Sequence, residues 1–192
     1  MRVRLLLGAG IFGLGLVSGL GAWQLSRVGV HEGYSPEQPL AFSHRIHAGE
    51  NKIPCLYCHY AARISRHAGI PPASLCMNCH GMMEKQTVEL ERLAEAVQQQ
   101  RPILWVKVHN LPDFVYFSHS QHVLSNVACQ QCHGPVERMD KVKQVSSLTM
   151  GWCLKCHREN AHIPTEVFRR ATLSLSKEQK AVAGLDCSSC HY

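Results

Sequence analysis

Five copies of the motif Cys-x-x-Cys-His constrain this chain more than any other feature of its sequence. The chain has 192 residues and ten cysteines, and every cysteine belongs to one of these motifs. In chain order the cysteine pairs are Cys55 and Cys58, Cys76 and Cys79, Cys129 and Cys132, Cys153 and Cys156, and Cys187 and Cys190. The histidines that directly follow the pairs are His59, His80, His133, His157 and His191. The motif is typical of covalent attachment of c-type haem.

The spacing of the motif explains this chemistry. Two thiols three positions apart can each form a thioether with one vinyl group of a single haem, and the next histidine then ligates the iron as the proximal ligand. We therefore predict five haem c groups. Zinc ribbons also use Cys-x-x-Cys pairs, but a structural zinc ion takes four ligands, and five pairs do not divide into closed two-pair sites. Thioredoxin-like redox pairs usually occur singly beside a strand and a helix, and no such context surrounds these motifs.

The first 27 residues predict a transmembrane anchor. Arg2 and Arg4 precede an uncharged run from Leu5 to Trp23, and a helix of that length spans roughly 28 Å, close to the hydrocarbon thickness of a bilayer. The positive flank is expected to stay in the cytoplasm, which places the rest of the chain on the periplasmic side, where bacteria attach haem. The alternative is a cleaved secretory signal, but Leu20 stands where the cleavage pattern needs a small residue.

An internal repeat organises the segment 28–192, which we interpret as a pentahaem cytochrome c domain. The string Phe42-Ser-His44-Arg-Ile-His47 recurs as Phe117-Ser-His119-Ser-Gln-His122, and each copy precedes two haem motifs. The pattern predicts two dihaem modules, at about 40–85 and about 115–160, followed by a fifth haem segment at about 161–192.

The expected fold class is mainly α with much irregular loop, because haems replace side chains as the main apolar filling. Only two helices are predicted from periodicity. One covers 87–99, with Leu90, Leu93 and Val97 on one face and Thr87 as its cap, and the other covers 176–184. Prolines interrupt the remaining sequence and predict loops and single turns.

Eight histidines are available for the sixth position of the haem irons, since five of the thirteen lie in the motifs. They are His31, His44, His47, His67, His109, His119, His122 and His162. A histidine or methionine in the sixth position gives an electron carrier, whereas an open position allows catalysis. In Phe-x-His-x-x-His the two imidazoles are three positions apart and diverge enough to serve neighbouring haems. This pattern makes His44, His47, His119 and His122 the leading candidate ligands.

The Phe-x-His-x-x-His pattern before Cys-x-x-Cys-His resembles that of class III cytochromes c and their small trihaem relatives. In those proteins the first histidine serves the next haem. The resemblance implies that His44 ligates the haem on Cys55 and Cys58, and that His119 ligates the haem on Cys129 and Cys132. It also implies that His47 and His122 reach other haems.

Longer strings resemble the pentahaem cytochrome c subunits of bacterial alternative complex III. They are Ser65–Pro71, Cys76–His80, Trp105–Phe117 and Met150–Cys153, and the resemblance covers nearly the whole chain. It implies an electron-transfer subunit of a respiratory quinol:electron acceptor oxidoreductase in the cytoplasmic membrane, which is not an enzyme on its own. The implied partners are an iron–sulfur subunit, polytopic quinol-binding subunits, and a soluble cytochrome, a copper protein or an oxidase as acceptor.

His67 and His109 are the next candidate ligands, because each lies in one of these family-like strings near a haem motif. The alternative is that they hydrogen-bond a haem propionate or a backbone carbonyl. Met150 and Met82 are candidate thioether ligands, and a methionine ligand would raise the reduction potential relative to bis-histidine ligation. The alternative for both methionines is apolar packing.

The formal charge of the polypeptide is +6, but each haem brings two propionates that offset it, so the charge does not indicate nucleic-acid binding. We find no phosphate-binding loop and no nucleophile–base arrangement, and we assign no catalytic residue. Two other functions stay open. One is a self-contained, membrane-anchored quinol dehydrogenase cytochrome, and the other is a multihaem reductase in which one haem lacks its sixth ligand.

Overall fold

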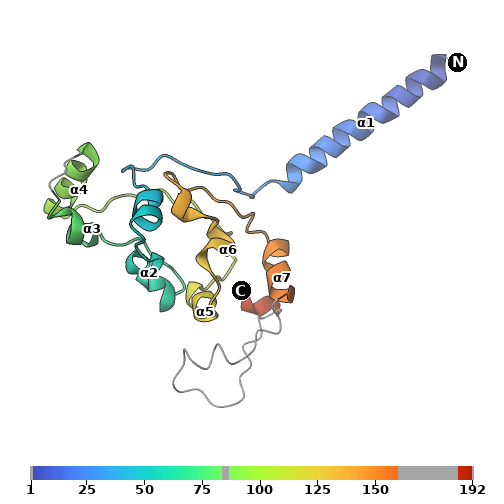
Figure 1. Ribbon diagram of the computed structural model, residues 1–192. Helices are drawn as coiled ribbons and strands as arrows, with labels where there is room; N and C mark the ends of the chain where they lie inside the picture. The colour runs from blue at the N-terminus through green and yellow to red at the C-terminus, as the bar shows by residue number, and fades with distance from the viewer. Residues whose placement is uncertain (1, 84–86, 160–185, 192) are drawn as a thin grey trace, which may run out of the picture. The chain divides into compact units, whose positions relative to one another are not determined.

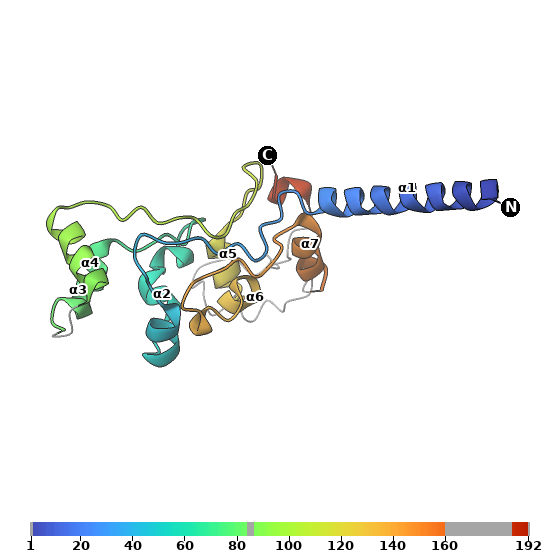
Figure 2. The same ribbon diagram turned by 90° about the horizontal axis from the view of Figure 1, so that it is seen from above.

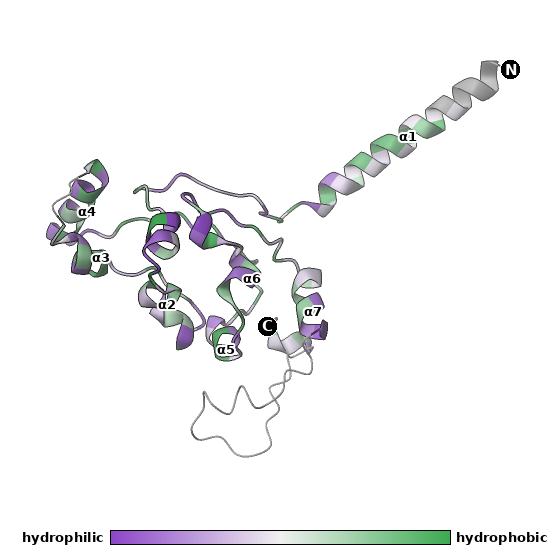
Figure 3. Ribbon diagram, viewed as in Figure 1, coloured by the Kyte–Doolittle hydropathy of each residue, from purple (hydrophilic) through white to green (hydrophobic). Residues whose placement is uncertain are grey.

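The computed structural model describes residues 2–83, 87–159 and 186–191, and the side chains of residues 2–7 and 9 lie outside this description. The chain divides into two compact units, Met1–Val30 and His31–Tyr192. The first unit is built on one helix, α1, which covers Arg2–Ser26. Apolar residues occur along this helix (Figure 3), and described ones such as Ile11, Phe12 and Leu14 are exposed.

The transmembrane anchor predicted for residues 1–27 is not supported. A search of the described residues finds no helix that combines the length and the apolar character needed to cross a membrane.

The second unit consists of short helices joined by irregular segments, as the sequence predicted (Figure 1). Its α-helices are α2 (Cys55–Cys58), α3 (Ala73–His80), α4 (Val88–Gln98), α5 (His119–Leu124), α6 (Cys129–His133) and α7 (Met150–Glu159). A π-helical turn, η1, covers Arg45–Glu50, and three 3-10 turns cover Tyr60–Arg63 (η2), Val136–Arg138 (η3) and Cys187–Ser189 (η4).

Helix α4 confirms one of the two helix predictions. The Thr87 hydroxyl accepts a hydrogen bond from the Leu90 backbone N–H at 3.3 Å, which satisfies one of the free donors of the first turn. Leu93 is buried, and α4 packs against α3. The second predicted helix, 176–184, lies outside the described residues.

Contacts between the two predicted dihaem modules hold the second unit together. Helix α5 of the second module packs on η2 of the first, where the backbone N–H groups of His119 and Ser120 donate to the carbonyls of Arg66 and Ser65 at 3.2 and 3.1 Å. Helix α7 lies beside the C-terminal turn η4 in both views (Figure 2).

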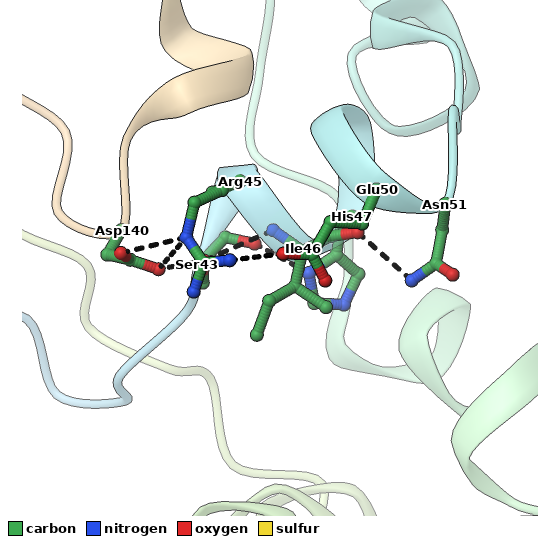
Figure 4. Close-up of polar contacts among 7 residues, drawn as sticks. All are labelled: Ser43, Arg45, Ile46, His47, Glu50, Asn51 and Asp140. Carbon is green, nitrogen blue, oxygen red and sulfur yellow. Dashed lines mark hydrogen bonds and ion pairs between the residues drawn. The ribbon is translucent and has the colours of Figure 1, made fainter.

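A polar junction joins η1 to η3 (Figure 4). Asp140 accepts hydrogen bonds from the Ser43 hydroxyl at 2.6 Å and from Arg45 Nε at 3.0 Å, and Arg45 also pairs with Glu50. Gly49 allows the close approach, because a Cβ atom there would lie 2.2 Å from the Glu137 carbonyl oxygen. Since all these charged groups are exposed, we attribute the specificity of the junction to its geometry and not to a large ion-pair energy.

Few side chains of the described part are buried. The buried apolar residues are Ala62 and Leu93, and the fully buried polar residue is Gln144. Large apolar side chains near the first two haem motifs, such as Tyr60, Ile64 and Ile70, are exposed, and apolar and polar residues alternate along the short helices (Figure 3). This distribution fits the expectation that bound haems supply the apolar filling of the unit.

Candidate haem-binding sites

Each Cys-x-x-Cys pair lies on a helical turn. The first four pairs lie on α2, α3, α6 and α7, and the fifth begins at the 3-10 turn η4. A helical turn places side chains three positions apart on the same face, so the two thiols of a pair point to one side, as attachment to a single haem requires. The local helix therefore positions the thiols, and it ends near the proximal histidine in the first, second and third motifs.

None of the ten cysteines forms a disulfide in the structure, so their sulfurs are available for thioether formation. Burial raises the pKa of five of the thiols, those of Cys58, Cys76, Cys129, Cys132 and Cys153. These sulfurs are therefore neutral thiols at pH 7 before haem attachment.

The two copies of the Phe-x-His-x-x-His repeat have similar ring contacts, although the first leads into a π-helical turn and the second into an α-helix. The ring centroids of Phe42 and His47 are 4.3 Å apart and the ring planes differ by 25°. The Phe42 ring is nearly perpendicular to that of His44. In the second copy the ring centroids of Phe117 and His122 are 4.6 Å apart and the ring planes differ by 33°. The Nδ1 atoms of His47 and His122 both lie 2.8 Å from the carbonyl oxygen four residues earlier. The phenylalanine and the carbonyl thus fix the second histidine in one orientation.

The hydrogen bonds of these histidines leave Nε2 available for a metal. An Nδ1–H that donates to a carbonyl fixes the tautomer in which Nε2 carries the free lone pair, which is how metal-bound histidines are usually held. Besides His47 and His122, His59 and His119 have this arrangement, with Nδ1 at 2.8 Å from the carbonyl oxygens of Gly69 and Arg66. The donor set therefore fits haem iron.

Three pairs of histidine rings have the separation expected of the two axial ligands of one haem. Two metal–nitrogen bonds of about 2 Å and the radii of the two rings place the ring centroids about 6 Å apart. The centroids of His47 and His80 are 5.9 Å apart, those of His119 and His133 are 6.3 Å apart, and those of His122 and His157 are 6.0 Å apart. In each pair a repeat histidine faces a motif histidine.

His44 lies close enough to His59 of the first motif for the two imidazoles to influence each other electrostatically. Burial lowers the pKa of its imidazole to about 4, with smaller contributions from the neighbouring His59 and His47. Burial likewise lowers the pKa of His133 to about 4. Both rings are therefore neutral at pH 7, the form in which an imidazole binds a metal. The Nδ1 atoms of His44 and His80 are buried without a hydrogen-bond partner.

His133 has a side-chain partner at Nδ1, whereas His59 and His191 have backbone carbonyls there. Its Nδ1 lies 3.2 Å from Nε2 of His109, and the two rings are nearly perpendicular, with centroids 4.3 Å apart. His109 therefore lies beside the Nδ1 edge of a proximal histidine, whereas His119 lies opposite the same ring at 6.3 Å.

The fifth motif lies against the segment before the second repeat. The Tyr116 backbone N–H donates to the Cys190 carbonyl at 2.6 Å, and Val115 forms an isolated antiparallel bridge with His191. The Nδ1 atom of His191 lies 3.3 Å from the Phe114 carbonyl oxygen, and the Phe114 ring stacks on the imidazole at 5.8 Å.

The other described candidate ligands lie at exposed positions. His67 is exposed, as are His31, Met82 and Met150, and His31 makes an edge contact with Tyr34. His162 lies outside the described residues. Sequence reasoning did not assign a role to Gln144, Phe42 or Phe117, although the repeat itself contains both phenylalanines. No local sequence signal marks Gln144 as a buried residue.

Comparison with known proteins agrees with this chemistry. Residues 115–192 match the family of cytochrome c7 and related cytochromes c. The chain is also 29% identical, over 181 residues, to the multihaem cytochrome c subunit of the menaquinone reductase of Nitratidesulfovibrio vulgaris, covering 81% of this chain and 84% of the relative. These matches do not extend to alternative complex III. The chain is mainly helical and is similar to multihaem cytochromes c, among them a menaquinone reductase subunit.

Proposed function

We propose that the chain transfers electrons through five haem c groups as a subunit of a membrane quinone or quinol oxidoreductase complex. The observation that carries this proposal is the set of three histidine pairs with centroids about 6 Å apart, each joining a repeat histidine to a motif histidine. Haem iron with two axial histidines supplies one-electron redox chemistry without an open site for a substrate.

We assign the axial pairs from these contacts. The pairs are His44 with His59, His47 with His80, His119 with His133, and His122 with His157. The last three rest on ring separations, and the first rests on the electrostatic contact between His44 and His59. In this assignment each repeat copy serves the haem of the next motif with its first histidine and the following haem with its second.

The contacts between motifs also support a spatial order of the haems. The pKa of Cys58 is raised by burial and then by Cys76, and that of Cys129 by burial and then by a hydrogen-bonded contact with Cys55. The pKa of Cys132 is raised by burial and then by Cys156, and that of Cys153 by burial and then by Cys190.

These neighbours connect the second motif to the first, the first to the third, the third to the fourth and the fourth to the fifth. The backbone contacts of α5 with Arg66 and Ser65 support the link between the first and third motifs. We therefore infer one unbranched series of haems, in the order second, first, third, fourth, fifth.

The relative supports the assignment to a complex, since it is the cytochrome subunit of a menaquinone reductase. The sequence strings shared with alternative complex III support the quinol-oxidising direction, with an iron–sulfur subunit and polytopic quinol-binding subunits as partners. The final acceptor would then be a soluble cytochrome, a copper protein or an oxidase. Covalent haem attachment supports a periplasmic position of the haem domain.

One observation favours a second candidate, a reductase with an open haem. At the fifth motif the proximal candidate His191 stacks on Phe114, whereas the described contacts of the second, third and fourth motifs pair each proximal candidate with a repeat histidine. An open sixth position at this haem would give a high-spin ferric signal.

The test is a redox titration of the purified holo-protein, followed by optical and EPR spectroscopy. We expect an intact mass that includes five haems and only low-spin ferric signals. His47→Ala and His122→Ala should each convert one haem to the high-spin form, while His31→Ala, an exposed histidine outside the assigned pairs, should leave the spectra unchanged. Fewer than five haems, or no effect of either ligand variant, would contradict the proposal.

A further inference from the structure

The contact between His109 and His133 differs from the Nδ1 contacts of two other motif histidines, His59 and His191. Nδ1 of His59 lies within hydrogen-bonding distance of the Gly69 carbonyl and Nδ1 of His191 within that of Phe114. His133 instead has a side-chain partner, Nε2 of His109, at 3.2 Å. A side-chain partner can be removed by substitution, whereas a backbone carbonyl remains in every variant.

The chemistry of ligation fixes the direction of this hydrogen bond. When Nε2 of His133 binds iron, its Nδ1 carries the proton and must donate, so Nε2 of His109 accepts. A hydrogen-bond acceptor on the second nitrogen increases the basicity of the metal-bound imidazole. A more basic ligand favours the ferric over the ferrous iron and thereby lowers the reduction potential.

Gln144 holds His109 in this position. Gln144 is fully buried, and its Oε1 accepts a hydrogen bond from the backbone N–H of Asn110, the residue after His109, at 3.2 Å. Its Nε2 donates to the Ser146 carbonyl at 3.0 Å, and the Ser146 hydroxyl donates to the Cys132 carbonyl at 2.7 Å. This series of hydrogen bonds connects the backbone next to His109 with the backbone next to His133.

We propose that His109 is a positioning residue of the third haem motif, which accepts a hydrogen bond from His133 and lowers the reduction potential of the haem held there. The inference rests on the proposed electron-transfer function and replaces the expectation that His109 is an iron ligand. Because the third haem is central in the inferred series, its potential governs transfer between the two dihaem modules.

The test compares His109→Leu, which removes the acceptor, with His109→Gln, whose amide oxygen can still accept. The readout is the midpoint potential of the third haem in an EPR-monitored titration. This haem can be recognised because the rings of His119 and His133 are nearly parallel, at 9°, whereas the other two pairs are tilted by 60° and 54°. His31→Leu is the control, since it makes the same chemical change at an exposed histidine.

We expect His109→Leu to raise the midpoint of this haem by an amount that corresponds to about a tenfold change in the ferric-to-ferrous equilibrium, about 59 mV for one electron. His109→Gln should cause a smaller shift, and His31→Leu none. Gln144→Ala keeps both histidines but removes the hydrogen bond to the backbone beside His109. It should shift the same midpoint in the same direction, so the inference stays testable if the leucine variant does not fold.

Two results would overturn the inference. Unchanged midpoints in both His109 variants would show that the contact has no effect on the haem, and a new high-spin haem in His109→Leu would make His109 an iron ligand. The haem content and spin state of the unmodified protein test the proposed function separately, because they do not depend on His109.

Discussion

At the scale of single residues, Gly134 has a conformation that other residues rarely adopt. It directly follows His133 and has a φ of 69°, and a Cβ atom there would lie 2.8 Å from Cγ2 of Val145. Both features require glycine, because an L-residue with positive φ is strained and the contact leaves no space for a methyl group. Gly134 therefore lets the chain leave α6 beside the side chain of Val145.

We predict that Gly134→Ala lowers the free energy of unfolding of the holo-protein by about 1–3 kcal/mol. The measurement is a urea titration followed by circular dichroism. Gly151→Ala in α7 is the matched control, because no atom lies within 4 Å of its added Cβ and its φ is not positive. Alanine there should be neutral or stabilise by up to about 1 kcal/mol. Equal stability of the two variants would contradict this interpretation of Gly134.

Single residues also show where sequence reasoning stops. The ten cysteines and five motif histidines are predicted to bind haem from their spacing alone, because the thioether chemistry requires that spacing. His109 could not be assigned in the same way, since its distance from His133 depends on how two segments 24 positions apart pack together. The burial of Gln144 could not be predicted, because nothing in its local sequence distinguishes a buried glutamine from an exposed one.

At the scale of elements, the η1–η3 junction depends on one carboxylate. Hydrogen bonds from Arg45 and then from Ser43 lower the pKa of Asp140 below its usual value of 3.8. A carboxyl whose pKa is lower in the folded state contributes stability that is fully present above the unfolded pKa and is lost as the pH falls through the folded pKa. The junction should therefore weaken only below about pH 4.

We predict that unfolding titrations of the holo-protein show a loss of stability below about pH 4 that is smaller in Asp140→Asn. The asparagine keeps the shape of the side chain and cannot titrate. Glu37, an exposed carboxylate that pairs with Lys141, provides the control variant Glu37→Gln. An unchanged pH dependence in Asp140→Asn would mean that this carboxyl does not contribute to the acid sensitivity.

Elements could be predicted where local forces decide them. The α4 helix followed from its apolar period and its threonine cap, and its observed bounds, Val88–Gln98, differ by one residue at each end from the predicted 87–99. The helices α2 and α6 contain four and five residues, too few for a periodic signal. Such short helices form because cofactor attachment and tertiary contacts stabilise them, which a window of sequence does not reveal.

At the scale of the whole molecule, the orientation of the axial rings predicts two classes of EPR signal. The angle between the two imidazole planes sets the rhombic splitting of a low-spin ferric haem. The His119–His133 pair is nearly parallel at 9°, and the His47–His80 and His122–His157 pairs are tilted by 60° and 54°. We predict that His119→Ala abolishes the near-parallel signal while His122→Ala removes a tilted one. If both variants affect the same signal, the assignment of the axial pairs is wrong.

The inferred order of the haems leads to a prediction about their mutual influence. The charge of one haem shifts the midpoint of another through a Coulomb interaction that weakens with distance, so nearest neighbours affect each other most. The near-parallel signal reports the third haem, whose neighbours in the series are those of the first and fourth motifs. The haems of the second and fifth motifs stand at the two ends.

Removal of an end haem, by Cys76→Ala with Cys79→Ala or by Cys187→Ala with Cys190→Ala, should therefore leave the midpoint of the near-parallel signal almost unchanged. Removal of a neighbouring haem, by Cys55→Ala with Cys58→Ala, should shift that midpoint clearly. The EPR-monitored titration that assigns the signal also measures both effects, and the end variants control for the general consequences of losing a haem. A large shift on loss of the fifth haem would place it beside the third and require a branched or different path for the electrons.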